Sequence, residues 1–544
     1  MRSLALGVFC LFVLNAQEAV RPPALAKPAE TAKPATPADR KAFQAAQGQK
    51  DPAARITELE KFLKDFPSSS MTSIARREIV TAALKQDPAD AVRRTKSLTK
   101  KLAPTEAAAL NRFLAAELIS QKKLLPDAEK ASKRAVKQFR YAPFAAEARQ
   151  EAERRKLKAP SEDQLRARYN SQHAQMKETV GQVLMERGKT GKAKRILLDA
   201  LKTNPSLTAA AASLGAISEN EGKTTDALDL YAHAMLAKPS PDSRKRFNEY
   251  WAKTKGSAGG QQEYLDQRHR TLFPNPLHPS KYVRSAQRTD RVVLGEEYTG
   301  SGCPPCVAAN LAFEAMLDRY PRTDFALIIY HEHIPRPDPM TNSDTLARWK
   351  WQQGRGVPTY AIDGEVMGMG GGPRDSAPEI ASLVQEKIDK RLDAAPAARI
   401  ELSTSHDGRS VSASAKVSSV SQDSPGLVLN IVLVEKELTY SGENGIRFHP
   451  MVARAVASFP LNGAKSKTET RRFDLAEVEA NLANHIDQFE KHDERHNKDG
   501  KFRFMERKTQ INPAHLAVVA FVQDSKTRQV LQAVYSDTNP QPVN

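Results

Sequence analysis

Two cysteines separated by two prolines are the residues of this chain that could carry out redox chemistry. Cys303 and Cys306 follow the turn sequence Thr-Gly-Ser-Gly and enclose Pro304 and Pro305. A cysteine at the start of a helix faces unpaired backbone N–H groups and the positive end of the helix dipole, which stabilise the thiolate and lower the pKa of the thiol. We therefore expect Cys303 to act as the nucleophile and Cys306, one turn further along, to resolve the mixed disulfide.

The elements that must position this dithiol are a strand before it and a helix after it. Pro304 and Pro305 have fixed φ angles at a point where a helix needs no N–H donors, so they favour a rigid helix start. The pattern predicts strands over 291–298 and 325–330, a helix from Pro304 to about Tyr320, a third strand from Tyr360, and a closing helix over 377–392.

A second motif, Gly-Val-Pro-Thr at residues 356–359, follows the dithiol by about fifty residues. With residues 298–306, Tyr-Thr-Gly-Ser-Gly-Cys-Pro-Pro-Cys, it makes residues 291–392 resemble a thioredoxin-like domain. The resemblance implies that Pro358 is cis and lies against the dithiol, and that Val357 offers backbone pairing to a substrate peptide. Two departures leave the redox potential open: Gly302 replaces the usual aromatic residue, and the central dipeptide is Pro-Pro rather than Gly-Pro.

Two carboxylates lie on the strand that precedes the dithiol. Glu296 and Glu297 are neighbours, so strand alternation directs one of them inward, although the sequence does not say which. An inward carboxylate could accept the proton of Cys306 during thiol exchange, whereas a surface carboxylate would have no such role.

Other sites compete with this interpretation. A structural disulfide between Cys303 and Cys306 would close a very short loop and would stabilise the fold little. A zinc site needs about four ligands, of which these two cysteines supply only two. His331 and His333 could add ligands for copper. The sequence also matches an EF-hand loop in part, with arginine replacing the first carboxylate, at Arg495, Asn497, Asp499, Gly500 and Glu506. No Walker loop, dinucleotide fingerprint or Gly-x-Ser-x-Gly elbow is present, so we predict no cofactor and no metal.

Length and charge indicate several domains of different character. The chain has 544 residues, which is too long for one hydrophobic core. Its formal net charge is +18. Residues 1–290 contain 52 Lys and Arg against 31 Asp and Glu, whereas residues 291–544 contain 30 against 33. The basic residues alternate with acidic ones at helical spacing and lack a nucleic-acid motif, so we expect no nucleic-acid partner.

A helical repeat region is predicted over residues 40–270. A shift of 34 residues superimposes six positions in the stretch 176–240 and resembles tetratricopeptide repeats (TPR): Gly181 on Gly215, Gly188 on Gly222, Lys189 on Lys223, Ala193 on Ala227, Ala200 on Ala234, and Pro205 on Pro239. Small residues let paired helices approach closely, and we interpret the looser pattern of 40–160 as further repeats of the same α-solenoid.

The remaining segments indicate export and a β domain. Residues 1–19 have the charged start and short apolar centre of a signal peptide, and residues 20–39 are a Pro, Ala and Lys-rich linker expected to be disordered. A second linker is expected over 271–290, before the thioredoxin-like domain at 291–394. Alternating runs over 395–544 predict an antiparallel, sandwich-like β domain interrupted by a polar insertion at 475–506. Residues 431–435, 440–445 and 449–454 resemble the carboxy-terminal part of Omp28-like secreted bacterial proteins.

These features favour an exported, periplasmic or secreted bacterial thiol–disulfide oxidoreductase. Its partners would be protein thiols and disulfides, an unidentified redox partner, and proteins recruited by the helical repeats; no transmembrane span is expected once the signal is removed. The alternative is an adaptor or assembly protein whose dithiol is incidental, regulatory or copper-binding.

Overall fold

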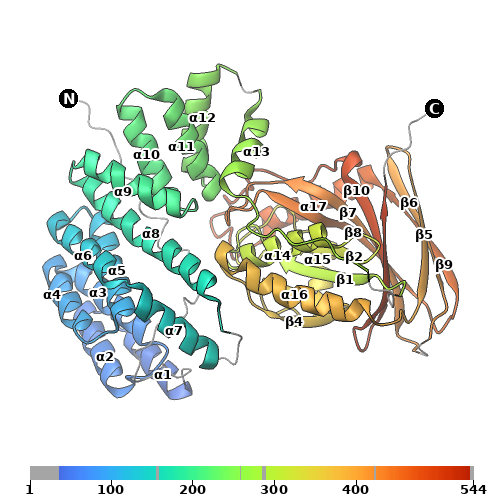
Figure 1. The fold of residues 1–544 in the computed structure, drawn as a ribbon, viewed down its shortest axis with the longest axis horizontal. Helices are drawn as coiled ribbons and strands as arrows, with labels where there is room; N and C mark the ends of the chain where they lie inside the picture. The colour runs from blue at the N-terminus through green and yellow to red at the C-terminus, as the bar shows by residue number, and fades with distance from the viewer. Residues whose placement is uncertain (1–35, 155–158, 258, 285–288, 422–423, 539–544) are drawn as a thin grey trace. The chain divides into compact units, whose positions relative to one another are not determined.

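The computed structural model describes residues 36–154, 159–257, 259–284, 289–421 and 424–538. The chain divides into two compact units, which meet in sequence between Leu272 and Phe273 (Figure 1). The predicted signal peptide and residues 20–35 of the predicted linker lie outside the described residues. The last residues assigned to that linker are helical, because the first described helix begins at Pro37.

The first unit is helical throughout its described part, as expected for the repeat region (Figure 1). Its helices are α1 (Pro37–Gln47), α2 (Pro52–Asp65), α3 (Thr72–Gln86), α4 (Pro88–Thr99), α5 (Pro104–Ser120), α6 (Leu125–Gln138), α7 (Tyr141–Arg154), α8 (Glu162–Glu186), α9 (Thr190–Thr203), α10 (Thr208–Asn220), α11 (Thr224–Ala237), α12 (Pro241–Lys255) and α13 (Gln261–Leu272). Several begin with proline at the first helical position, where its missing N–H costs nothing.

The 34-residue repeat is present as two consecutive packed helix pairs, α8 with α9 and α10 with α11. A Cβ atom at Gly181 would lie 2.4 Å from Leu197, and one at Gly215 would lie 2.8 Å from Tyr231, at the equivalent position of the next pair. Gly188 and Gly222 turn the chain between the paired helices with φ angles of 69° and 72°. The repeated glycines therefore do what the sequence predicts: one allows close helix contact and the other a left-handed turn.

The predicted linker over 271–290 is packed rather than free where it is described. The side chain of Asn275 donates to the carbonyl of Leu311, the backbone N–H of Tyr282 donates to Arg319, and Arg284 pairs with the buried Asp324. From Phe273 onward this segment therefore belongs to the second unit, whereas its first two residues end α13 of the first unit.

The second unit is built on a mixed eight-stranded sheet in the order β11-β10-β7-β8-β2-β1-β3-β4. Its strands are β1 (Val293–Thr299), β2 (Phe325–His331), β3 (Thr359–Ile362), β4 (Glu365–Met369), β7 (Leu427–Thr439), β8 (Phe448–Pro460), β10 (Leu516–Asp524) and β11 (Val530–Asp537). β2 runs parallel to β1 and to β8, and the other pairs are antiparallel. A separate antiparallel sheet has the order β5-β6-β9, from β5 (Arg399–His406), β6 (Ser410–Ser418) and β9 (Lys467–Asp474).

The structure differs from the predicted division at residue 394, because strands from both sides of that boundary form one sheet. The join is β2 with β8, through the pair Ile329 and Val452. Arg291 makes a second contact across the boundary, since it bonds Asp363, directly after β3, at 2.6 Å and the carbonyl of Val530, at the start of β11, at 2.9 Å. The carboxy-terminal strands thus extend the sheet that carries the dithiol and do not form an independent domain. The predicted sandwich-like packing is present within this unit, because β6 of the three-stranded sheet shares a hydrophobic core with β7 and β10.

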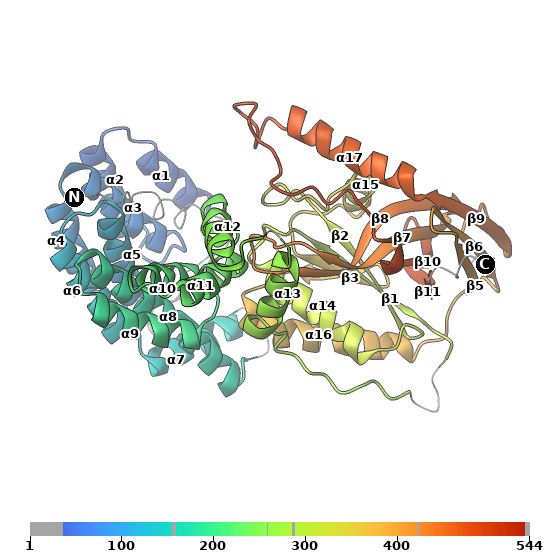
Figure 2. The ribbon, with the colours of Figure 1, turned by 90° about the horizontal axis from the view of Figure 1, so that it is seen from above.

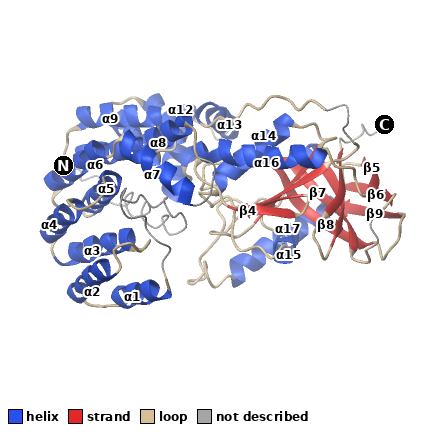
Figure 3. Ribbon diagram, turned by 60° about the horizontal axis from the view of Figure 1, so that its bottom comes forward, coloured by secondary structure: helices blue, strands red, loops and turns tan. Residues whose placement is uncertain are grey.

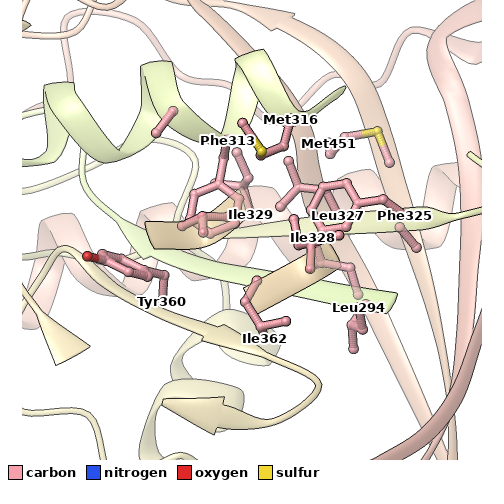
Figure 4. Close-up of a cluster of buried hydrophobic side chains, with 14 of the residues drawn as sticks. Leu294, Phe313, Met316, Phe325, Leu327, Ile328, Ile329, Tyr360, Ile362 and Met451 are labelled. Carbon is pink, nitrogen blue, oxygen red and sulfur yellow. The ribbon is translucent and has the colours of Figure 1, made fainter. Parts of the chain in front are cut away.

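Helices cover the large sheet on both faces (Figures 2 and 3). α14 (Cys306–Arg319) and α16 (Ala377–Leu392) lie on one side of it, and α15 (Ser343–Trp351) and α17 (Leu475–His492) on the other. Phe313 and Met316 of α14 pack against the aliphatic side chains of β2, and Met451 of β8 joins the same core (Figure 4). α17 occupies most of the predicted polar insertion, where Leu475, Val478, Leu482 and Ile486 form a buried helical face.

No helix within the described ranges combines the length and apolar character needed to cross a membrane.

Candidate redox site

The dithiol lies in the turn between β1 and α14, as the sequence predicts. β1 ends at Thr299 and α14 begins at Cys306, so Cys303 precedes the helix and Pro305 is its capping residue. Cys303 and Cys306 form a disulfide bond. Cys303 is 1% exposed and Cys306 is completely buried, so in this oxidised form both sulfurs are shielded from water.

The Gly-Val-Pro-Thr motif lies beside the dithiol. The Val357–Pro358 peptide bond is cis, which is the isomer that the resemblance implies. The sulfur of Cys303 is 3.7 Å from the carbonyl oxygen of Val357. Gly371 packs against both Pro305 and Pro358, because a Cβ atom there would lie 1.9 Å from the Pro305 carbonyl oxygen and 2.8 Å from Cγ of Pro358. The two segments that the sequence singled out are therefore brought together.

Glu296 and Glu297 are both completely buried, on opposite faces of β1. The expectation that only one faces the interior is corrected here, because helices cover both faces of this central strand. Glu296 points to the α15 side and forms an ion pair with Arg348 at 2.7 Å. Glu297 points to the α14 side, which is the side of Cys306.

Glu297 is linked to the dithiol through Asn310 of α14. In the amide orientation that satisfies all its neighbours, the side-chain nitrogen of Asn310 lies 2.7 Å from Oε1 of Glu297 and 2.8 Å from the carbonyl oxygen of Cys306. The other carboxylate oxygen of Glu297 has no hydrogen-bond partner among the described residues, and burial raises the pKa of this carboxyl group well above its usual value. Glu297 therefore stays protonated to higher pH than an exposed glutamate, and of the two carboxyl groups it is the one linked to Cys306.

Asp338 supports the turn before Cys303 from the loop that follows β2. Its carboxylate accepts the backbone N–H of Ser301 at 2.6 Å and contacts Nδ1 of His331 at 2.9 Å. Although burial opposes ionisation, these partners lower the pKa of Asp338 far below its usual value. The sequence analysis missed both Asp338 and Asn310, since neither lies in a recognisable motif.

The two histidines considered as metal ligands point to different partners. β2 ends at His331, so His333 lies beyond the strand. His331 contacts Asp338, whereas His333 stacks on Phe489 and approaches His485, with 3.2 Å between the Nε2 atoms. Among the residues that the structure describes, no group of three or more His, Cys, Asp and Glu side chains is arranged to hold a metal ion, and this includes the partial EF-hand match at 495–506.

Comparison with known proteins adds no argument about function. No protein-family model and no curated protein matches the chain. Among solved structures it is similar to HBP35 of Porphyromonas gingivalis, at 14% identity over 47% of this chain and 79% of that one, with a TM-score of 0.31. MamA is similar at 15% identity over 38% and 97%, with a TM-score of 0.25. TTC0263, a thermophilic TPR protein in Thermus thermophilus, is similar at 18% identity over 39% and 98%, with a TM-score of 0.25. At TM-scores this low the comparisons carry no argument, so the helical repeats are described from their own geometry.

Proposed function

We propose that this protein is a thiol–disulfide oxidoreductase in which a thioredoxin-like unit carries the Cys303–Cys306 dithiol. The observation that carries the proposal is the position of the disulfide, at the start of α14 and with the sulfur of Cys303 3.7 Å from the carbonyl oxygen of Val357, the residue before Pro358. A disulfide used only for stability would close a four-residue loop, which removes little conformational entropy from the unfolded chain. The place and the surroundings of the pair are thus better explained by exchange chemistry.

The reaction transfers two electrons between the dithiol and a partner disulfide. The Cys303 thiolate attacks one partner sulfur, forming a mixed disulfide and releasing the other partner sulfur as a thiolate. Cys306 then loses its proton and attacks the sulfur of Cys303, so the second partner sulfur leaves and the Cys303–Cys306 bond forms. The partner is reduced and this protein is oxidised; the reverse sequence oxidises a partner dithiol.

Residues around the pair have separate parts in this scheme. Glu297, when ionised, accepts the proton that Cys306 loses, and when neutral returns it in the reverse direction. The Val357 backbone offers hydrogen bonds to an extended partner peptide. The helical pairs of the first unit recruit protein partners, since arrays of this kind present a long continuous surface. The signal-like residues 1–19 support export, to the periplasm or the medium, where disulfide chemistry persists.

Equilibration with glutathione buffers tests the proposal. The full chain should carry Cys10→Ser, so that Cys303 and Cys306 are the only thiols. We expect the pair to cycle, Cys303→Ser to abolish exchange, and Cys306→Ser to accumulate a mixed disulfide. A potential near about −270 mV would indicate a reductase and one near about −120 mV an oxidant.

An adaptor protein with an incidental or regulatory disulfide is the second candidate, and the burial of both sulfurs favours it. The two functions diverge in the same assay. A cysteine pair that never cycles between those potentials overturns the oxidoreductase proposal. Both candidate functions predict that partner binding survives Cys303→Ser.

A further inference from the structure

The turn between β7 and β8 contacts the dithiol turn from a distant part of the sequence. Gly442 approaches so closely that a Cβ atom there would lie 2.8 Å from the carbonyl oxygen of Ser301. The same oxygen accepts the backbone N–H of Asn444 at 3.0 Å. A segment that begins more than 130 residues after Cys303 is thus in direct backbone contact with the residues that precede this cysteine.

The side chain of Asn444 uses both ends of its carboxamide. Its nitrogen donates to the carbonyl oxygens of Gly300 and Cys303, each at 3.3 Å. Its oxygen accepts the backbone N–H of Ile446 at 3.0 Å, which fixes the orientation of the amide. Aspartate has no donor for the two carbonyls, so the geometry requires an amide at this position.

The turn that carries the dithiol has few side chains of its own that could stabilise its conformation. Gly300 and Gly302 have no side chains, and Asp338 holds Ser301 from the other side. The carbonyls of Gly300 and Cys303 also accept the backbone N–H groups of Cys303 and Cys306, at 3.0 and 3.1 Å. Asn444 therefore binds the same two oxygens that define the turn around the reactive sulfur.

We infer that Asn444 is a positioning residue of the dithiol, which holds these two carbonyls and favours the thiolate of Cys303. The inference rests on the proposed function. A carbonyl oxygen carries partial negative charge, and an amide donor on it reduces its repulsion of a nearby thiolate. Stabilising the thiolate stabilises the reduced form, so Asn444 makes the pair a stronger oxidant than it would be alone.

Two substitutions of Asn444 provide a graded test in the full chain with Cys10→Ser. Asn444→Ala removes the donor, and Asn444→Asp keeps the shape but places a carboxylate against both carbonyls. We expect Asn444→Ala to shift the equilibrium with glutathione about tenfold toward the disulfide, which is about 30 mV for two electrons. Asn444→Asp should shift it further in the same direction, and both should raise the pKa of the Cys303 thiol, measured from alkylation rates against pH.

Asn430→Ala is the matched control, because Asn430 lies in β7 and bonds Ser458 of β8, within the same hairpin. It should leave both the potential and the alkylation profile unchanged. Should Asn444→Asp fail to fold, Asn444→Ser replaces it, since a hydroxyl is too short to reach both carbonyls. A parent chain that does not cycle overturns the proposed function; a parent that cycles, with Asn444 variants within twofold of the Asn430→Ala control, overturns the positioning role alone.

Discussion

A buried glutamate at the end of β2 makes the stability of the second unit depend on pH. Glu332 is completely buried, and neither of its carboxylate oxygens has a hydrogen-bond partner among the described residues. Burial, with a smaller contribution from the charge of Asp338, raises the pKa of Glu332 to about 9. Glu332 is therefore neutral in the folded protein at physiological pH.

The size of the effect follows from proton linkage. The pKa of Glu332 is about 9 in the folded chain and about 4.3 for an unfolded glutamate. Unfolding releases a proton between these values, so stability falls by about 1.4 kcal/mol for each unit of rising pH. From pH 5.5 to pH 8 the loss is about 3 kcal/mol, a large part of the total stability of a domain. Glu332→Gln, which cannot ionise, removes this loss.

Urea unfolding at the two pH values measures the difference. Trp251→Phe restricts the fluorescence signal to Trp349 and Trp351, both on α15 of the second unit. We expect the gain from Glu332→Gln to grow by about 3 kcal/mol between pH 5.5 and pH 8. Glu494→Gln, at an exposed position, controls for the chemical change. A gain that is equal at the two pH values would refute the reasoning, because it would mean that Glu332 is already ionised in the folded protein.

Two further predictions concern the repeat and the redox site. Gly181→Ala should destabilise the first unit by about 1–3 kcal/mol through overpacking against Leu197. Gly191→Ala in α9, where a Cβ atom would meet nothing within 4 Å, is the control and should be neutral or stabilising. Thermal unfolding followed by circular dichroism compares the two variants, and equal effects would contradict the close contact at Gly181. Glu297→Gln should leave the alkylation rate of Cys303 unchanged. It should remove one titration from the pH profile of the rate at which Cys306 resolves the mixed disulfide, measured by rapid quenching. An unaltered profile would exclude Glu297 as the proton acceptor.

Features that depend on neighbouring residues could be predicted from the sequence. The turn glycines, the two prolines and the spacing of the cysteines indicate a strand, a turn and a helix, because each acts on its own backbone. The 34-residue repeat is equally local, since each glycine faces a residue sixteen positions ahead in the adjoining helix. Strands such as β6 and β10 follow from alternation or from continuous apolar runs.

Two further local patterns in the sequence bear on burial. Every residue of β1 and β2 is buried, and β2 has the continuous apolar pattern of a strand covered on both faces. A strand of this kind predicts helices on both faces of its sheet, which leaves a neighbouring strand such as β1 no solvent-facing side for Glu296 or Glu297. In the predicted polar insertion, Leu475, Val478, Leu482 and Ile486 recur at helical spacing, although the many charged residues between them conceal the apolar face of α17.

The part of the site that could not be predicted is the part supplied by strand pairing. β8 meets β2 at Val452 and Ile329, and the ring of His449 lies 5.1 Å from that of His331. This contact holds the start of β8, and with it the turn that carries Asn444, against the end of β2, which pairs with β1, the strand before the dithiol. In the sequence, Asn444 belongs to a Gly-Glu-Asn-Gly turn, and none of the neighbouring residues indicates a contact with Cys303. The sheet order decides which distant turn reaches the cysteines, so the carboxy-terminal strands are better regarded as a component of the candidate redox site than as a separate domain attached to it.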